Sequence, residues 1–129
     1  MSSEFSTSKL GTKYDKKFIL EHDKDYHNIL HYLRRLEGNR RCADCNSKDN
    51  NWCSVNIGVF LCINCAQIHR GVGTHISKVK SCMGTYRWHP DEIERMKSVG
   101  NINASKIYGE FRNDGKTPTS KWVTDKYGK

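Results

Sequence analysis

Apolar side chains recur at helical spacing in the first third of the chain. They mark one face of a predicted helix and are Tyr26, Ile29, Leu30, Leu33 and Leu36. Asp23 is suited to cap the start of this helix, and Gly38 is placed to end it. Residues 1–12 are rich in Ser, Thr and Lys instead, a composition typical of a loose segment. We therefore expect a flexible tail over residues 1–22 and one folded domain over residues 23–129.

Short β-prone runs replace the helical pattern in the middle of the chain. Residues 52–55 and 59–61 are separated by Asn56-Ile57-Gly58, a sequence typical of a turn. These two runs are expected to pair as a hairpin. A further run over residues 78–82 is a candidate third strand.

The pattern becomes helical again after the hairpin. Residues 63–69 are expected to form a helix that carries Arg70 near its C-terminal end. Further on, Pro90 suits the first position of another helix, and Ser120 suits the cap of a last short one. The apolar positions of the three C-terminal helices are Ile93, Met96 and Val99; Ala104, Ile107, Tyr108 and Phe111; and Trp122, Val123 and Tyr127.

Four of the six cysteines form two close pairs in the spacing C-x2-C-x16-C-x2-C, and they are Cys42, Cys45, Cys62 and Cys65. Each C-x2-C turn directs two thiolates at one ion, and a gap of roughly 15–20 residues lets a hairpin bring the pairs together. Disulfides are the alternative, but the polar N-terminal residues do not resemble a secretory signal, so we expect a reducing compartment. The spacing therefore predicts one structural zinc ion.

These elements together predict an α+β fold, in which a small zinc-bound three-stranded antiparallel sheet, a C4 zinc finger, is surrounded by helices. Lysine and arginine number 22 against 14 acidic residues, which gives a net charge of +8. Such a balance favours an anionic partner, whether nucleic acid, acidic protein or membrane surface. Because the excess is spread along the chain, it does not choose among them.

Several motifs together resemble the Arf GTPase-activating protein (ArfGAP) domain family, and the likeness covers roughly residues 25–129. The motifs combine the cysteine spacing with an arginine that follows the last cysteine after four residues. They are Cys42-Ala43-Asp44-Cys45, Trp52, Asn56-Ile57-Gly58-Val59-Phe60, Cys62-Ile63-Asn64-Cys65, Ile68-His69-Arg70-Gly71-Val72-Gly73, His75-Ile76-Ser77, Val79-Lys80-Ser81, Trp88, Gly100-Asn101, Ala104 and Lys126-Tyr127.

This resemblance implies a protein that stimulates GTP hydrolysis by a GTP-bound Arf-family small GTPase and so regulates vesicular traffic. Arg70 matches the catalytic arginine of the family, which would be supplied in trans, so the chain is not a hydrolase on its own. Trp52 matches a tryptophan near that arginine, where it would support it or contact the partner. The four cysteines would hold a closed, structural zinc site. We expect a cytoplasmic protein recruited to Golgi or vesicle membranes, with peripheral contact to an anionic surface.

Other residues near these motifs receive more ordinary interpretations. Cys53 and Cys82 lie outside the ligand spacing and are expected to be small buried side chains. His69 and His75 are expected to form hydrogen bonds, since four thiolates already complete a tetrahedron. Asp44 either orients Arg70 or a backbone amide or is simply exposed.

Two departures from the family pattern concern the partner surface. The connection from Ser81 to Trp88 is one residue longer than usual and lacks an aspartate common in the family, and Ser105 replaces a frequent asparagine. Two other functions also stay open. A nucleic-acid-binding C4 finger would share nearly this spacing, as GATA-type fingers do, but no dense basic cluster follows the second cysteine pair. An interaction module without catalysis is the other, although retention of Arg70 argues against it.

Overall fold

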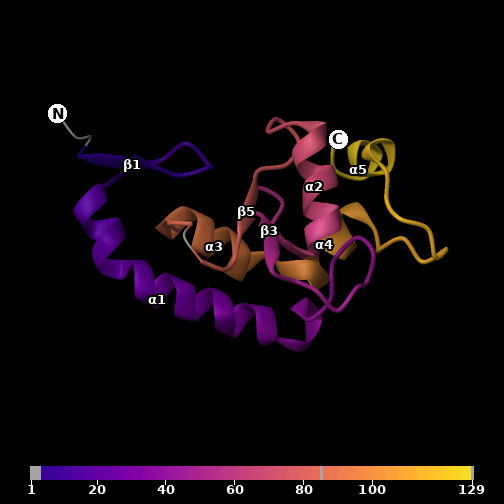
Figure 1. Cartoon of the computed structure of the whole chain (residues 1–129), viewed down its shortest axis with the longest axis horizontal. Helices are drawn as coiled ribbons and strands as arrows, with labels where there is room; N and C mark the ends of the chain where they lie inside the picture. The colour runs from indigo at the N-terminus through magenta and orange to yellow at the C-terminus, as the bar shows by residue number, and fades with distance from the viewer. Residues whose placement is uncertain (1–3, 85, 129) are drawn as a thin grey trace.

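The computed structural model describes residues 4–84 and 86–128, and within these ranges it has five α-helices and two antiparallel sheets. In Figure 1 the long helix α1 runs along one side of the molecule. The N-terminal hairpin lies at one end of the molecule, and α5 lies at the opposite end. The helices are α1 (Lys16–Arg35), α2 (Ile63–Val72), α3 (Pro90–Ser98), α4 (Gly100–Tyr108) and α5 (Ser120–Tyr127), with the short 3-10 helix η1 (Glu37–Asn39) after α1. The strands are β1 (Phe5–Thr7), β2 (Lys13–Asp15), β3 (Trp52–Ser54), β4 (Val59–Leu61) and β5 (Val79–Ser81).

The central sheet has the order β4-β3-β5, which confirms the predicted hairpin and third strand. Trp52 of β3 lies opposite Leu61 of β4 on one side and opposite Ser81 of β5 on the other. The turn between β3 and β4 contains Gly58 with a φ of +89°, and a Cβ atom there would lie 2.6 Å from the Val99 side chain. Glycine is therefore required at this turn both for its backbone conformation and for space.

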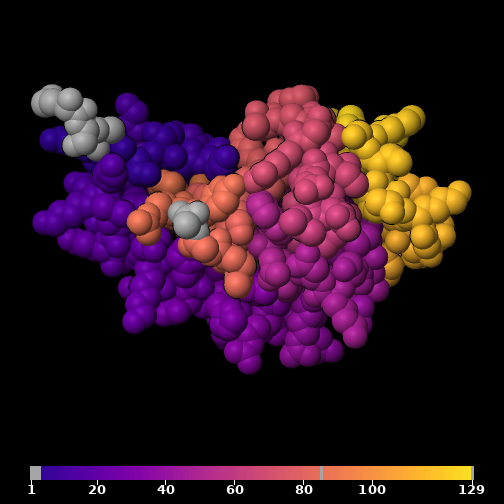
Figure 2. Space-filling model, viewed as in Figure 1, coloured from indigo at the N-terminus to yellow at the C-terminus, as the bar shows by residue number. Residues whose placement is uncertain are grey.

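Successive residues of the sheet face two separate cores, because side chains alternate along a strand. One core joins the sheet to α2, α4 and α5, and the other joins it to α1 and α3. Buried members of the first include Val59, Leu61, Ala66, Val79, Ala104 and Val123, and those of the second include Leu30, Leu33, Cys53, Phe60, Trp88, Ile93 and Met96. Figure 2 shows the yellow C-terminal residues beside α2, at the end of the molecule away from the hairpin.

The first helix begins earlier than the apolar pattern predicts. It starts at Lys16, and the Asp15 carboxylate caps it by accepting a hydrogen bond from the Lys17 amide at 2.8 Å. The predicted start at Asp23 is wrong, because the apolar residues in the first two turns of α1, Phe18, Ile19 and Leu20, are consecutive and do not show helical spacing. Ile19, in these turns, is nevertheless buried.

The described part of the expected tail, residues 4–22, is structured. Strands β1 and β2 form an antiparallel hairpin that packs against the start of α3. The Ser8 hydroxyl donates to Asp91 Oδ2 at 2.7 Å, and the Lys9 amide donates to Glu92 Oε2 at 2.7 Å. Residues 1–3 of the expected tail lie outside the described residues. Contacts with α3, far along the sequence, thus order a segment whose composition indicates a loose tail.

The C-terminal helices follow the prediction with small shifts. Helix α3 begins at the predicted proline. Helix α4 ends at a Gly109 cap, so Phe111 lies outside it, and Ile107 is 66% exposed instead of buried. Helix α5 is capped by Thr119 rather than by Ser120, which is its first residue. None of the helices in the described ranges is long and apolar enough to cross a membrane.

Candidate metal centre and arginine site

The four predicted cysteines meet in one cluster. Cys42 and Cys45 lie in the loop before β3, Cys62 caps the start of α2, and Cys65 lies in the first turn of that helix. Their Sγ atoms all lie within 4.8 Å of one another, and Cys45 Sγ is 3.6 Å from Cys62 Sγ. A tetrahedral ion with metal–sulfur bonds of about 2.3 Å separates its sulfurs by about 3.8 Å. The cluster is therefore placed to hold one four-coordinate metal ion.

The chemistry of these thiols also fits a bound cation. Hydrogen bonds from Cys42 and Cys65 lower the pKa of the Cys62 thiol. The pKa of Cys42 is raised by its hydrogen bond to Cys62, and that of Cys65 is raised by its hydrogen bonds to both. Cys62 is thus the more readily ionised thiol, whereas Cys42 and Cys65 resist ionisation. Metal ligation requires thiolates, so a bound divalent cation would favour the ionised form of its cysteine ligands.

Helix α2 connects this cluster to Arg70. Its first turn is fixed by the Cys62 sulfur, which accepts a hydrogen bond from the Cys65 amide at 3.3 Å. The inner face of the helix buries Cys65, Ala66 and His69, whereas Arg70 is exposed. Arg70 stands five residues beyond Cys65, about 7–8 Å along the helix axis. A metal held at the start of α2 would therefore fix the base from which Arg70 projects.

A buried carboxylate ties α2 to the first cysteine pair. Asp44 lies between Cys42 and Cys45 in sequence and is 0% exposed. His69 Nε2 donates to Asp44 Oδ2 at 2.6 Å, while His69 Nδ1 lies 2.7 Å from the Ser77 hydroxyl. The predicted hydrogen-bonding role of His69 is confirmed. Asp44 is neither exposed nor bonded to Arg70, because the packing of α2 on the first cysteine loop encloses it.

The same carboxylate also holds α5. The Tyr127 hydroxyl donates to Asp44 Oδ1, and Lys126 Nζ donates to the same oxygen at 3.2 Å. Burial alone would raise the pKa of Asp44, but the hydrogen bond and charge of His69, with Lys126 and Tyr127, lower it overall. The pKa of Tyr127 is raised, first by burial and then by the Asp44 charge. Asp44 is therefore held as an anion that joins α2 and α5 to the cysteine loop.

The Arg70 guanidinium lies against two aromatic residues. Its Cζ atom is 4.8 Å from the centroid of the Trp52 ring, and its Nη2 donates to the Tyr86 hydroxyl at 2.8 Å. The two rings are 6.4 Å apart and meet edge to face at 75°. Among the described residues, no carboxylate forms an ion pair with Arg70. The guanidinium is thus held in place while its charge stays available at the surface.

The remaining candidates take no part in the cluster. Cys53 and Cys82 are buried in the core beside α1 and α3, as expected of small apolar side chains, and burial raises the pKa of Cys53. His75 is exposed after α2 and lies outside the four-cysteine group. Among the described residues, the group placed to hold a metal ion is therefore the four cysteines that the spacing predicts.

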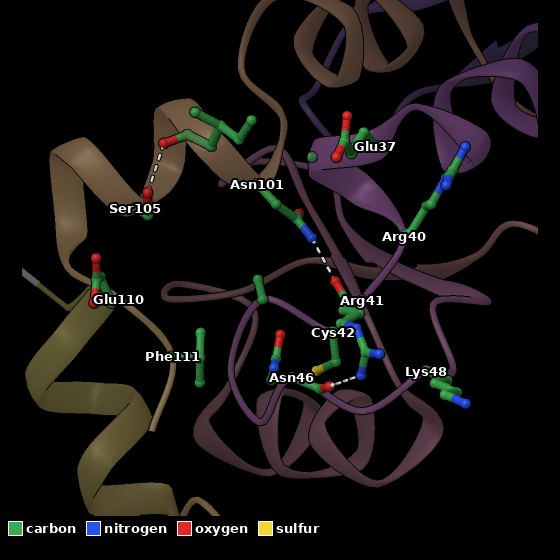
Figure 3. Close-up of a pocket in the computed structure, with 13 residues that line it drawn as sticks. Glu37, Arg40, Arg41, Cys42, Asn46, Lys48, Asn101, Ser105, Glu110 and Phe111 are labelled. Carbon is green, nitrogen blue, oxygen red and sulfur yellow. Dashed lines mark hydrogen bonds between the residues drawn. The ribbon is translucent and has the colours of Figure 1, made fainter. Parts of the chain in front are cut away.

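A cavity of about 650 Å³ lies on another part of the surface. Its lining includes three cations, Arg40, Arg41 and Lys48, and Cys42. In Figure 3 the Asn101 amide reaches the Arg41 carbonyl, and the Arg41 side chain turns toward the Asn46 carbonyl. Neither Arg70 nor Trp52 lines this cavity. Arg70 instead stands on an open surface, an arrangement that suits a macromolecular partner better than an enclosed small substrate.

Sequence reasoning missed the hydroxyl partner of Arg70. Tyr86 lies in the connection between Ser81 and Trp88 that departs from the family pattern, and nothing in its immediate sequence indicates its contact. The pairing of Trp52 with Ser81 does place the end of β5 beside Trp52. The residues that follow Ser81 are therefore the ones expected to lie near Trp52 and Arg70. The family motif places Arg70 but says nothing about this neighbour.

Comparison with known proteins agrees with this geometry. The ArfGap family model, described as "Putative GTPase activating protein for Arf", matches residues 27–129. The chain belongs to the ArfGAP family. The resemblance drawn from its motifs is thereby confirmed, and the nucleic-acid alternative is not favoured.

Individual relatives of this ArfGAP domain are much longer proteins. Mouse stromal membrane-associated protein 1 is 50% identical over 80 residues, which cover 62% of the chain and 18% of that protein. UBA domain-containing protein 3 of Schizosaccharomyces pombe is 41% identical over 108 residues, 77% of the chain and 18% of that protein. The chain thus spans about a fifth of the length of these curated relatives.

The fold of this ArfGAP domain is also found in solved structures. The ArfGap domain of HIV-1 Rev binding protein superposes with a TM-score of 0.70, covering 87% of this chain and 90% of the other at 21% identity. The predicted α+β arrangement of a small antiparallel sheet among helices is confirmed.

Proposed function

We propose that this domain stimulates GTP hydrolysis by a GTP-bound Arf-family small GTPase, into whose active site it inserts the Arg70 guanidinium. The observation that carries the proposal is the exposed Arg70 side chain, which lies on Trp52 and has no carboxylate partner among the described residues. Membership of a family described as acting on Arf gives the class of partner.

The chemistry of the reaction explains why an arginine is needed. Negative charge develops on the oxygens around the transferred phosphoryl group, and a planar guanidinium can meet two of them at once. Arginines supplied in trans accelerate such hydrolysis by about 10³–10⁵, which corresponds to roughly 4–7 kcal/mol of transition-state stabilisation. Lysine would supply charge without the two-pronged geometry.

The four cysteines are the proposed ligands of one structural zinc ion. With four thiolate ligands, zinc has no open position for water or substrate, so its contribution is to stabilise the fold. The residues themselves place Arg70: Cys62 and Cys65 fix the start of α2, and His69 fixes its buried face to Asp44. Such fixation matters because a displacement of about 1 Å can cost on the order of 100-fold in rate.

We also propose a site of action at Golgi or vesicle membranes, in the regulation of vesicular traffic. The net charge of +8 supports peripheral contact with an anionic membrane surface during this work. The Arf-family partner, rather than a specific nucleic acid, is the proposed target of the exposed Arg70.

Single-turnover hydrolysis by GTP-loaded Arf-family GTPases tests the proposal. The parent domain should accelerate hydrolysis, and Arg70→Lys should lose at least about 100-fold of rate, or roughly 2.7 kcal/mol. Arg70→Lys should nevertheless unfold at the same temperature as the parent, bind the same amount of zinc and keep most of its affinity for the partner. Arg35→Lys is the matched control, because Arg35 is an exposed arginine at the end of α1.

Two results would contradict the proposal. If Arg70→Lys stimulated hydrolysis as well as the parent at saturation, Arg70 would not be the inserted arginine. If the parent stimulated no Arf-family GTPase, the activity itself would be refuted for this chain.

A further inference from the structure

The Tyr86 hydroxyl is the only described polar group bonded to the Arg70 guanidinium. It accepts from Arg70 Nη2 at 2.8 Å, while the Arg70 Cζ atom lies 4.8 Å from the centroid of the Trp52 ring. Tyr86 is half-buried, and its ring meets Trp52 edge to face. The three side chains thus form one group, which comes from the end of α2, from β3 and from the segment between β5 and α3.

The position of Tyr86 is itself fixed by contacts with α1. His27 Nε2, on that helix, bonds the Tyr86 carbonyl oxygen at 3.0 Å. The next residue, Arg87, forms an ion pair with Asp23 of α1 at 2.8 Å. The indole of Trp88 then donates to the carbonyl of the last β5 residue at 3.1 Å. The hydroxyl is therefore presented from a segment anchored on both the long helix and the sheet.

From this geometry we infer that Tyr86 is a positioning residue for Arg70, a role that rests on the proposed function. An exposed arginine samples many rotamers, and fixing it beforehand removes part of the entropy lost when the guanidinium is held against the reacting phosphoryl group in the transition state. The Trp52 ring restrains the guanidinium plane at Cζ, and the Tyr86 hydroxyl restrains its rotation at Nη2. Both contacts are needed because a ring face alone lets the guanidinium turn within its plane.

The chemical nature of the acceptor is part of the inference. A hydroxyl oxygen is uncharged, so the hydrogen bond does not neutralise the positive charge of Arg70. A carboxylate in the same place would hold the guanidinium more strongly, but it would also compete with phosphate oxygens for the same donors. One of the five N–H donors bonds Tyr86, and the others stay available to the partner.

The test removes only the hydroxyl. Tyr86→Phe keeps the ring and its contact with Trp52, and Tyr32→Phe is the matched control on an exposed tyrosine of α1. With a GTP-loaded Arf-family GTPase at saturation, Tyr86→Phe should lower the single-turnover rate about three- to tenfold, the worth of one hydrogen bond. The concentration for half-saturation, the zinc content and the thermal midpoint should stay the same. In an Arg70→Lys background, Tyr86→Phe should cause less than a twofold further loss.

A second readout does not depend on activity. In nitrogen-15 NMR spectra, the Arg70 Nη signals should be resolved in the parent and Tyr32→Phe proteins and averaged by rotation in Tyr86→Phe. Averaged signals in the parent would overturn the inference even if no GTPase responded.

The remaining outcomes also decide the question. If the parent is active and Tyr86→Phe matches or exceeds its saturated rate, Tyr86 does not position Arg70. If Tyr86→Phe changes only half-saturation or the thermal midpoint, Tyr86 serves docking or folding instead, and the inference fails. An inactive parent with resolved Nη signals would refute the proposed function while leaving the hydrogen bond established.

Discussion

The two faces of the central sheet are packed by different kinds of side chain. We call the side packed on α2 and α5, which includes the four cysteines, the metal face, and the side packed on α1 and α3 the helical face. Each face buries one carboxylate completely, Asp44 on the metal face and Glu92 on the helical face. Their partners differ. Asp44 is bonded by side chains of α2 and α5, whereas Glu92 accepts from Lys80 Nζ at 2.6 Å and from the His89 amide at 2.9 Å.

The apolar cores differ in the size of their side chains. The helical face contains the fully buried Trp88, Phe60 and Leu30, whereas Leu61 is the largest fully buried apolar residue of the metal face. Both faces contain cysteines, but among the described residues only those of the metal face are grouped so that they could hold a metal ion. Metal ligation would therefore add to apolar burial on the metal face and not on the helical face. The face that carries Arg70 is thus the one expected to depend on the metal.

Loss of one ligand should have the largest effect. Cys65→Ser should lose zinc and most of the helical signal, because ligation contributes about 10–16 kcal/mol, as much as the whole stability of a typical domain. Metal analysis and circular dichroism measure the two losses. Cys53→Ser, a buried cysteine of the helical face, is the control and should keep its zinc. A Cys65→Ser protein that stayed metal-bound and helical would show that the metal face does not need this ligand.

Breaking the buried ion pair should destabilise the protein through the helical face without removing the metal. Lys80→Met leaves Glu92 charged and buried without its cation, which should cost about 3–5 kcal/mol in urea unfolding. Burial lowers the pKa of Lys80, although Glu92 favours its charged form. Zinc content should not change, and the exposed Lys97→Met on α3 should shift stability by less than about 0.5 kcal/mol. Loss of zinc in Lys80→Met would show that the two faces are not separable.

The sequence predicted best those features that depend on neighbours along the chain. The cysteine spacing, the hairpin turn and the proline start of α3 are local signals, and each is found in the structure. The ordered N-terminal hairpin was missed because its lysines and serines look disordered by composition. The contacts that order it join residues 83 positions apart, such as Ser8 and Asp91.

The burial of polar residues likewise cannot be predicted from neighbouring residues in the sequence. An aspartate in a cysteine loop is normally exposed, and Asp44 is enclosed only because His69 and Tyr127 converge on it from α2 and α5. In the same way, the sequence shows that the connection after β5 is one residue longer than usual, but only its path in the folded protein shows that Tyr86 contacts Arg70. Tertiary packing decides such contacts, and no periodicity along the chain reports it.

The smallest effect is expected at the hairpin, which adds a further layer to the helical face only. The Ser8 hydroxyl donates to Asp91 and also accepts from the Thr12 amide at 3.0 Å, so it joins the hairpin loop to α3. Ser8→Ala should therefore cost about 1–2 kcal/mol, less than the ion pair because Asp91 can regain water. Hydrogen exchange should quicken at the Thr12 amide and stay unchanged in α2. The control is Ser105→Ala, whose hydroxyl bonds only its own helix. If exchange quickened equally in α2, the hairpin would support the whole domain, and the division between the two faces would have to be abandoned.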